Sequence, residues 1–342
     1  MMLNRYDPRG TAFVRMGRFN PDEAACNLWW SGSGVRTKLA CTRVEIEATV
    51  PDQENLPMVS VTVDGAPVAR FALRPGTHRY DLLGRMDVGE VHEVAVLRDS
   101  QPTDQDAAPL VLDAVYTDGE PAAPEHRPRL IEFLGDSLTV GEGTVGPKGD
   151  MAWRMLWCCH QFAFPALAAE ALKADKRLVA LGGWGAYLSY DANPTHTIPT
   201  IYDQLCGIAP AGGAPYDFAA QRPASAVVIN LGTNDCGAID KMTGDAKAEA
   251  LAAFEDSAAA LMARARKHNP DAAILWAYGL CGNGLEAPLR RAVERRRAAG
   301  DGNVRYLALD DCAGDLGSQS HPGRNAHKRA AAQIVEALED ML

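Results

Sequence analysis

Residues 1–118 carry the alternation of apolar and polar positions that is typical of short strands. Apolar and polar side chains alternate along residues 42–50, as they do in a half-buried strand. Residues 58–73 hold two apolar runs around Asp64 and Gly65, a dipeptide that favours a hairpin turn. Two further apolar runs follow at short intervals, and no strong helical period appears. This pattern predicts a β-sandwich domain over residues 1–118.

The pattern changes after a segment rich in proline and polar residues, 119–128, which we interpret as a linker between domains. Residues 129–342 alternate apolar strands with helical segments. We expect the strands at 130–134, 177–181, 226–231, 273–278 and 304–309, and the clearest helices at 244–268 and 326–342. Such alternation predicts an α/β domain of three layers, α/β/α, in which helices cover both faces of a parallel sheet.

Chemically active residue types follow the predicted strands. The first strand leads into GDS, which contains Ser137, the second into GGWG, which contains Gly183, and the third into GTND, which contains Asn234. His321 lies just before the final predicted helix. Because the carboxyl ends of parallel strands share one edge of a sheet, we expect these four residues to lie at one site.

This set of residues fits acyl transfer. A serine hydroxyl is a poor nucleophile at its free pKa and needs an adjacent base, which His321 can supply to Ser137. The tetrahedral intermediate needs hydrogen-bond donors for its oxyanion. The backbone N–H groups of Ser137 and Gly183 and the side-chain amide of Asn234 are the candidate donors, and Gly183 lacks the Cβ that would keep substrate away from its backbone.

In order and spacing, the motifs GDSLTVGEG, GGWG, GTND and the HP before the last helix resemble those of SGNH (GDSL-type) hydrolases. Ser137, Gly183, Asn234 and His321 match the four residues for which that family is named. The longer stretch IEFLGDSLTVGEG and the β-rich first domain look most like carbohydrate esterase family 2. Members of that family join a jelly-roll domain to an SGNH domain and remove acetyl groups from sugars, so the resemblance implies both for this chain.

One position departs from the wider superfamily, which usually has an aspartate three residues before the catalytic histidine. That position is Ser318 here. A carboxylate normally holds the imidazole in the productive tautomer. We consider three explanations: a backbone carbonyl near Ser318 or Gln319 orients His321, which we prefer, a displaced carboxylate does so, or the enzyme is impaired. The candidates for the displaced carboxylate are Asp310, Asp311 and Asp315.

Aromatic residues near the same edge of the sheet are candidates for stacking on a sugar ring. Trp184 follows the second strand and is the preferred substrate contact. Trp276 is a second candidate, although core packing is an equal explanation for an aromatic residue inside an apolar strand. We expect Asp136 and Asp235 to be structural, each accepting hydrogen bonds from nearby backbone N–H groups.

Composition restricts the partners. Of the 342 residues, 47% are hydrophobic and 23% are charged, which is typical of a globular protein, and the net charge of −10 disfavours nucleic acid or an anionic membrane as a partner. No signal-peptide pattern and no apolar run of transmembrane length appears, so we expect a cytoplasmic protein. The eight cysteines include no CxxC pair, and we interpret them as reduced thiols. No metal or organic cofactor is implied.

These inferences combine into one hypothesis. The chain is predicted to be a serine esterase that removes O-acetyl groups from carbohydrates, such as acetylated oligosaccharides, through a covalent acetyl-serine intermediate. The alternatives are a lipid or small-ester hydrolase of the same chemistry, and a carbohydrate-binding protein with an impaired esterase domain. The oligomeric state and the identity of the sugar stay open.

Overall fold

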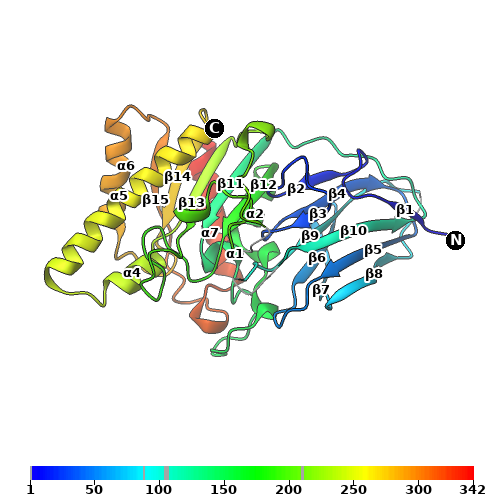
Figure 1. Ribbon diagram of the computed structural model, residues 1–342, viewed down its shortest axis with the longest axis horizontal. Coiled ribbons are helices and arrows are strands. Elements are labelled where there is room, and N and C mark those ends of the chain that lie inside the picture. Colours follow the sequence, from blue (N-terminus) through cyan, green and yellow to red (C-terminus); the bar gives the residue numbers. More distant parts are fainter. Residues whose placement is uncertain (1, 88, 104–107, 209–211) are drawn as a thin grey trace. The chain divides into compact units, whose positions relative to one another are not determined.

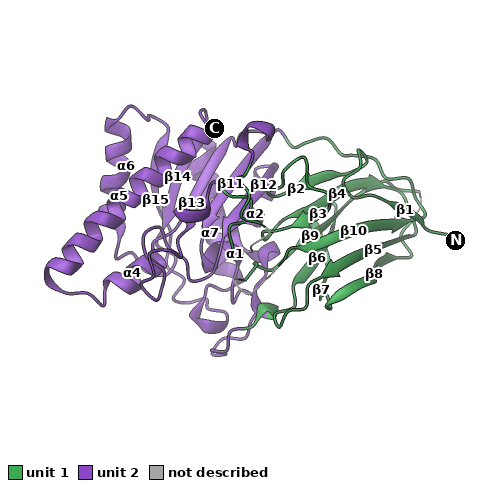
Figure 2. Cartoon of the chain, in the orientation of Figure 1, with its two compact units in different colours: residues 1–127, 154–156, 204–216 green, residues 128–153, 157–203, 217–342 purple. Residues whose placement is uncertain are grey.

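The computed structural model describes residues 2–87, 89–103, 108–208 and 212–342, which group into two compact units (Figure 2). Unit 1 contains residues 1–127, 154–156 and 204–216, and unit 2 contains residues 128–153, 157–203 and 217–342. The segment expected to be a linker is partly fixed to unit 1. There Ala122 and Lys38 exchange two backbone hydrogen bonds of 2.8 and 2.9 Å.

Unit 1 consists of two five-stranded antiparallel sheets (Figure 1). One has the strand order β1–β10–β5–β8, with β3 also paired to β10, and the other has the order β2–β4–β9–β6–β7. The strands are β1 (Asn4–Tyr6), β2 (Val14–Met16), β3 (Cys26–Leu28), β4 (Gly34–Leu39), β5 (Arg43–Val50), β6 (Met58–Val63), β7 (Ala66–Ala72), β8 (Gly76–Gly84), β9 (His92–Arg98) and β10 (Leu110–Thr117). A single hydrophobic cluster takes inward-facing residues from both sheets, including Ile46, Val61, Val96 and Val115. The predicted β-sandwich is therefore confirmed.

The hairpin expected at Asp64 and Gly65 joins β6 to β7. Both turn residues have positive φ, +50° and +82°. Two consecutive residues of positive φ give the turn the twist that adjacent antiparallel strands require, and Asp and Gly adopt this conformation more readily than other residues.

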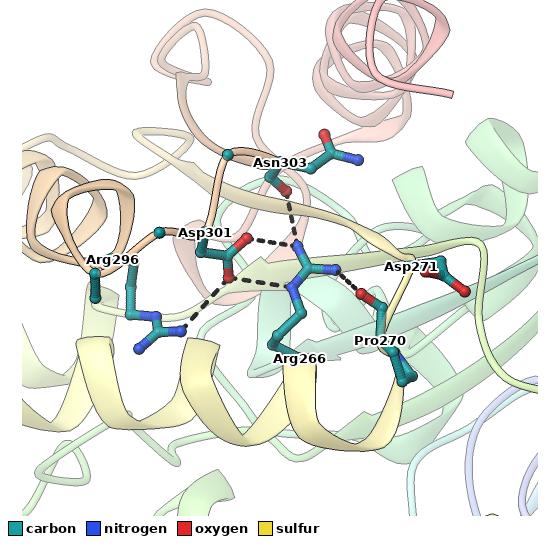
Figure 3. Close-up of a pocket in the computed structure, with 9 residues that line it drawn as sticks. Arg266, Pro270, Asp271, Arg296, Asp301 and Asn303 are labelled. Carbon is teal, nitrogen blue, oxygen red and sulfur yellow. Dashed lines mark hydrogen bonds and ion pairs between the residues drawn. The ribbon is translucent and has the colours of Figure 1, made fainter.

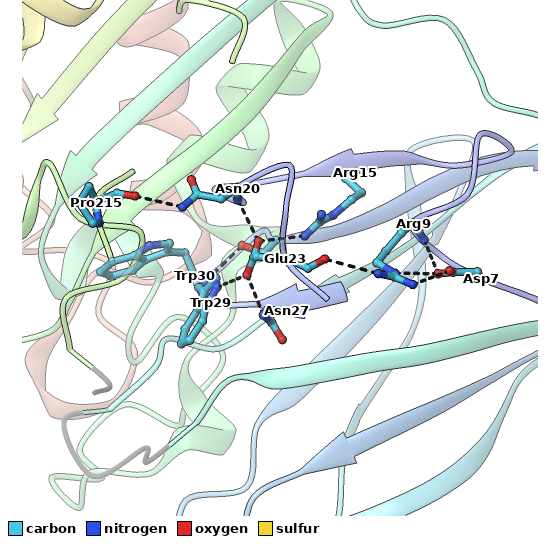
Figure 4. A network of polar contacts seen from close by, with 10 residues as sticks. Asp7, Arg9, Arg15, Asn20, Glu23, Asn27, Trp29, Trp30 and Pro215 are labelled. Atoms are coloured by element: carbon cyan, nitrogen blue, oxygen red, sulfur yellow. Dashed lines mark hydrogen bonds and ion pairs between the residues drawn. The ribbon is translucent and has the colours of Figure 1, made fainter. Parts of the chain in front are cut away.

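A buried carboxylate organises the irregular segment between β2 and β3 in unit 1 (Figure 4). Glu23 Oε1 accepts hydrogen bonds from Asn27 Nδ2 (2.7 Å) and Trp29 Nε1 (3.0 Å). Its Oε2 accepts from the Asn20 N–H (2.9 Å) and from Arg15 (3.3 Å). Four donors compensate the cost of burying this charge, so the segment is held in one conformation.

Unit 2 is built on a parallel sheet with the strand order β12–β11–β13–β14–β15. These strands are β11 (Arg129–Gly135), β12 (Ala174–Ala180), β13 (Ala226–Asn230), β14 (Ala273–Tyr278) and β15 (Val304–Ala308). The helices are α1 (Ser137–Val140), α2 (Phe164–Ala171), α3 (Ile198–Ile201), α4 (Thr233–Ile239), α5 (Gly244–His268), α6 (Glu286–Ala298) and α7 (Arg324–Glu339). All five strands lie within three residues of their expected bounds.

Helices cover both faces of this sheet (Figure 1). On one face, Phe133, Val228 and Leu275 share a hydrophobic cluster with residues of α2 and α7. On the other face, α5 packs on β14 and α6 packs on β15. The central strands β13 and β14 are buried along their whole length and are almost entirely apolar, as a sheet covered on both faces requires. The predicted three-layer α/β/α architecture is confirmed. In the described part of the chain, no helix is both long and apolar enough to cross a membrane.

Candidate active site

Ser137 lies at a sharp corner where β11 ends and α1 begins. Asp136 caps the short helix, and its Oδ1 accepts the Leu138 N–H at 3.0 Å. Gly135 is required at this corner because a Cβ there would come within 1.9 Å of Thr139 Oγ1. Ser137 is 7% exposed. As the first residue of the helix it keeps a backbone N–H that the helix itself cannot use.

Gly183 follows β12 and has a φ of +81°, a conformation that favours glycine. The ring of Tyr190 lies over it, so that a Cβ at position 183 would come within 2.9 Å of that ring. The Gly183 carbonyl accepts the Tyr190 N–H at 2.9 Å. In the described part of the chain the N–H groups of Ser137 and Gly183 have no acceptor, so both are available to a ligand.

Asn234, on the first turn of α4, has its side-chain amide fixed on two sides. Nδ2 donates to the Trp184 carbonyl at 2.8 Å and to Asp136 Oδ2 at 3.3 Å. Burial, together with the nearby Asp235 and Glu142 carboxylates, raises the pKa of Asp136 to about 8. At neutral pH Asp136 is therefore mostly uncharged, which makes it the weaker of the two acceptors.

Asp235 holds the loop after β12 in place. One carboxylate oxygen accepts the Ala186 N–H at 2.9 Å, and the other accepts the N–H groups of Tyr187 (2.7 Å) and Leu188 (2.8 Å). The expected structural role of Asp235 is thus seen in its contacts. The loop that carries Gly183 is fixed to α4, which carries Asn234.

His321 is oriented by a backbone carbonyl. Its Nδ1 lies 3.1 Å from the carbonyl oxygen of Gln319. Because a carbonyl can only accept, the proton is on Nδ1 and Nε2 is left unprotonated. Gln319 and Ser320 both have positive φ, +53° and +57°, which turns the Gln319 carbonyl back toward the ring. This arrangement corresponds to the first of the three explanations for the absent aspartate.

The three carboxylates considered as replacements have other surroundings. Asp315 accepts the N–H of Ala326 at the start of α7. Asp311 accepts the Gly282 N–H at 3.1 Å, and Asp310 is exposed. Among the described residues, none of these carboxylates bonds to the imidazole.

Among the described residues, the Ser318 hydroxyl makes no hydrogen bond to the imidazole either. Its side chain is fully buried against Gly146 and Trp157, and its Oγ has no hydrogen-bond partner among the described residues. Its backbone does contribute, because the N–H donates to the Gly143 carbonyl at 3.1 Å and the carbonyl accepts the His321 N–H at 3.0 Å. Ser318 therefore positions the loop through its main chain.

One turn connects the serine and the histidine. The Ser137 carbonyl accepts the N–H groups of Gly141 (3.1 Å) and Glu142 (2.9 Å). The next residue, Gly143, has a φ of +72° and is so close to the other loop that a Cβ would lie 2.8 Å from His321 Cβ. The turn at residues 141–143 thus contacts the Ser137 backbone on one side and the His321 loop on the other.

The aromatic candidates have different environments. Trp276 is 0% exposed and its indole N–H donates to the Leu231 carbonyl at 3.1 Å, so the prediction that it contacts substrate is wrong. A strand buried on both faces leaves no side chain at the surface. Trp184 is half-buried and stacks on His196, with ring centroids 5.4 Å apart and an interplanar angle of 8°.

Two residues of the site were not identified from the sequence. Gly143 belongs to the quoted GDSLTVGEG motif, but only the folded chain shows its contact with the His321 loop. Tyr190 is 64% exposed beside Gly183 and presents an aromatic ring at the site. The sequence signal that could have identified Tyr190 is its position five residues after the GGWG motif.

Two other histidines are buried and neutral. His327 Nδ1 accepts the Phe164 N–H at 3.3 Å, so Nε2 carries the proton and donates to Thr144 Oγ1 at 3.0 Å. Burial lowers its pKa to about 3. Burial also lowers the pKa of His160, which follows the buried Cys158 and Cys159. Among the described residues no group of three metal-binding side chains is found, and all eight cysteines are free thiols.

A polar pocket of about 450 Å³ lies at the opposite edge of the sheet, where β14 and β15 begin (Figure 3). Arg266 donates to both carboxylate oxygens of Asp301 (2.8 and 3.1 Å) and to the carbonyls of Asn303 and Ala272. Arg296 also pairs with Asp301, at 3.6 Å. The charged side chains that line the pocket compensate one another, and we assign this pocket a structural role.

Comparisons with known proteins agree with this architecture. Residues 15–123 match the family model described as carbohydrate esterase 2 N-terminal. The chain is 26% identical over 337 residues to the cellulase/esterase CelE of Acetivibrio thermocellus, covering 95% of this chain. It spans only 39% of the length of that relative.

Solved structures share the fold along the whole chain. The acetyl xylan esterase Est2A from the rumen bacterium Butyrivibrio proteoclasticus has a TM-score of 0.94 and 26% identity, with 99% of this chain and 98% of that chain covered. A family two carbohydrate esterase from Clostridium thermocellum, solved with cellohexaose, has a TM-score of 0.84 and 23% identity, with 96% and 98% covered. The chain thus resembles carbohydrate esterase family 2: residues 15–123 match the N-terminal model of that family, and the fold shared with the solved structures continues through the second unit.

Proposed function

We propose that this protein is a serine esterase that removes O-acetyl groups from carbohydrates. The observation that carries the proposal is the His321 Nδ1–Gln319 carbonyl bond of 3.1 Å, which leaves Nε2 as a base. The same loop is tied to the turn that holds Ser137. A serine, an oriented imidazole and two free backbone N–H groups are the parts that acyl transfer needs.

In the proposed reaction, Ser137 Oγ attacks the acetyl carbonyl carbon while His321 Nε2 takes the hydroxyl proton. The oxyanion accepts hydrogen bonds from the N–H groups of Ser137 and Gly183. Asn234 adds a third donor when its long bond to Asp136 (3.3 Å) is released. The C–O bond to the sugar then breaks, and the imidazolium protonates the departing sugar oxygen. Water repeats the sequence on the acetyl-serine and releases acetate.

A carbohydrate substrate is supported by the aromatic surfaces of the loop after β12. Tyr190 is largely exposed beside the oxyanion glycine, and the Trp184–His196 stack belongs to the same loop. Aromatic faces suit the apolar faces of sugar rings. The names of the similar proteins, an acetyl xylan esterase and a carbohydrate esterase solved with cellohexaose, support the same substrate class.

Acetate release from acetylated oligosaccharides and hydrolysis of 4-nitrophenyl esters from acetate to octanoate would test the proposal. We expect hydrolysis of the acetate, a steep fall with chain length, and loss of activity by at least about a thousandfold in Ser137→Ala. A preference for long acyl chains would favour a lipid esterase. Activity that persists in Ser137→Ala, or a parent protein that binds oligosaccharide without releasing acetate, would overturn the proposal.

A further inference from the structure

The carbonyl that orients His321 belongs to Gln319, whose own side chain contacts the buried carboxylate of Glu142. Gln319 has its backbone N–H bonded to the Asp150 carbonyl at 2.7 Å. The orientation of its side-chain amide follows from its neighbours. Nε2 donates to Glu142 Oε1 at 3.1 Å, and the amide oxygen accepts the Trp153 N–H at 3.3 Å. Both ends of Gln319 are therefore fixed.

These contacts are needed because the backbone of the loop is strained. Positive φ at two consecutive residues other than glycine, Gln319 and Ser320, is an unfavourable backbone conformation that outside contacts must maintain. Without outside contacts the loop would relax and the carbonyl would turn away from the ring. The contacts to Asp150, Glu142 and Trp153 are those that oppose this relaxation.

Glu142 is well placed to connect the two halves of the site. Its side chain is buried, and its backbone N–H donates to the Ser137 carbonyl at 2.9 Å. Its carboxylate reaches the Gln319 amide, whose backbone carbonyl in turn accepts from His321. A continuous path of contacts thus runs from the nucleophile through Glu142 and Gln319 to the base.

We propose that Glu142 and Gln319 are positioning residues which, by holding the Gln319 carbonyl against His321 Nδ1, replace the aspartate that the sequence lacks at Ser318. A buried negative charge one side chain away from the imidazole also stabilises the imidazolium that forms during the reaction. This inference rests on the proposed esterase function and adds two residues to its machinery.

The test compares Glu142→Gln, Gln319→Glu and the double exchange Glu142→Gln/Gln319→Glu with the parent on 4-nitrophenyl acetate. Gln319→Glu removes the donor and brings two carboxylates together, whereas Glu142→Gln removes the charge and leaves a weaker, neutral amide–amide hydrogen bond. We expect kcat to fall about tenfold to hundredfold in Gln319→Glu and about tenfold in Glu142→Gln, with KM within about twofold in both. The exchange restores the hydrogen bond in reverse, and we expect it to recover kcat to within about threefold of the parent. The exposed Glu170→Gln on α2 is the control and should match the parent.

A second readout does not depend on activity. The His321 Nδ1 proton should give a downfield proton NMR signal in the parent, identified by its loss in His321→Gln, and we expect it to broaden or vanish in both single variants and return in the exchange. A parent that is inactive but shows this pattern would refute the esterase and keep the positioning role. An active parent whose single variants retain both kcat and the signal, or whose exchange is as weak as the singles, would overturn the inference.

Discussion

At the scale of single residues, the site depends on positions where no larger side chain fits. Gly143 combines a positive φ with contact to both Ser318 and His321, because a Cβ there would lie 2.5 Å from the Ser318 carbonyl oxygen. This glycine allows the turn after Ser137 to lie close to the loop that carries His321.

We therefore expect Gly143→Ala to lower kcat by about a hundredfold or more, since a displacement of about 1 Å at a catalytic group has effects of that size. Steady-state kinetics on 4-nitrophenyl acetate would measure it. Gly149→Ala is the matched control, because Gly149 also has a positive φ, +91°, but a Cβ there meets no atom within 4 Å. Equal losses in both variants would mean that backbone strain alone is responsible.

The buried hydroxyl of Ser318 leads to a prediction in the opposite direction. Ser318→Ala removes a polar atom with no partner among the described residues, so we expect activity within about twofold and a free energy of unfolding unchanged or raised by up to about 1 kcal/mol. Ser318→Asp places a charge in the same enclosed position and should lower that free energy by about 3 kcal/mol. Urea denaturation monitors both, and a stable Ser318→Asp variant with higher kcat would contradict this account.

At the scale of elements, the site is a set of loops held to the ends of strands and helices. The loop after β12 has little regular structure, yet three of its successive N–H groups converge on the Asp235 carboxylate from α4. Burial raises the pKa of this carboxyl, while the three N–H bonds lower it. One side chain thus fixes the loop that carries Gly183 and Tyr190.

Asp235→Ala should leave the three N–H groups without an acceptor and release the loop. We expect the free energy of unfolding to fall by about 2–4 kcal/mol and kcat to fall with it, because unsatisfied buried donors cost about 1–3 kcal/mol each before relaxation. Chemical denaturation and kinetics on one preparation would measure both. Asp240→Asn, an exposed change at the end of the same helix, should lower neither the free energy of unfolding nor kcat. Wild-type values for Asp235→Ala would show that other contacts hold the loop.

At the scale of the whole chain, stability in unit 2 depends on a buried polar network. Glu132 on β11 pairs with Arg177 on β12 at 2.8 Å and accepts the Tyr202 hydroxyl at 2.8 Å. Arg177 also donates to Asn269 Oδ1 at 3.2 Å. The network links two strands to the end of α5.

Removing one partner of this buried pair should be costly. We expect Glu132→Ala to lower the free energy of unfolding by about 3–5 kcal/mol, because Arg177 is left as a buried charge without its carboxylate. Glu286→Ala, which breaks the exposed Glu286–Arg290 pair on α6, should cost less than about 1 kcal/mol. Urea denaturation distinguishes the two, and similar values for both would contradict the role given to the network.

The pH dependence of stability should reflect His327. Its pKa falls from the ordinary 6.5 to about 3 in the folded chain, so between these values the unfolded chain binds the extra proton. Stability from this group is therefore full above about pH 6.5 and is lost as the pH falls toward 3. Denaturation at several pH values should show a shallower acid loss in His327→Gln. An unchanged slope would assign the acid sensitivity to other groups.

Burial of Asp136 has the opposite effect on the pH dependence of stability. Its pKa is raised to about 8, so the folded chain keeps a proton that the unfolded chain releases near 3.8. The contribution of this group to stability is full below about pH 3.8 and is lost as the pH rises through 8. The two titration ranges overlap between about pH 3.8 and 6.5, where the opposite slopes cancel, so these two groups together favour stability in that interval.

The sequence alone determined the architecture of both units and the residue types at the site. The strict alternation along residues 42–50 and the continuous apolar runs such as 273–278 differ because one kind of strand is buried on one face and the other kind on both. Those periods are local properties, so they are visible before folding. The turn at Asp64 and Gly65 is local for the same reason.

Only the tertiary structure decided how His321 is oriented and whether Trp276 is accessible. Every residue has a carbonyl, so nothing in the sequence marks that of Gln319 as the acceptor, and its direction depends on positive φ values that distant contacts maintain. Trp276 lies in an apolar run that is compatible with either a core or a site until the helices that cover the sheet are known. Local patterns determine which element forms, whereas acceptors and exposed surfaces result from contacts between elements far apart in the chain.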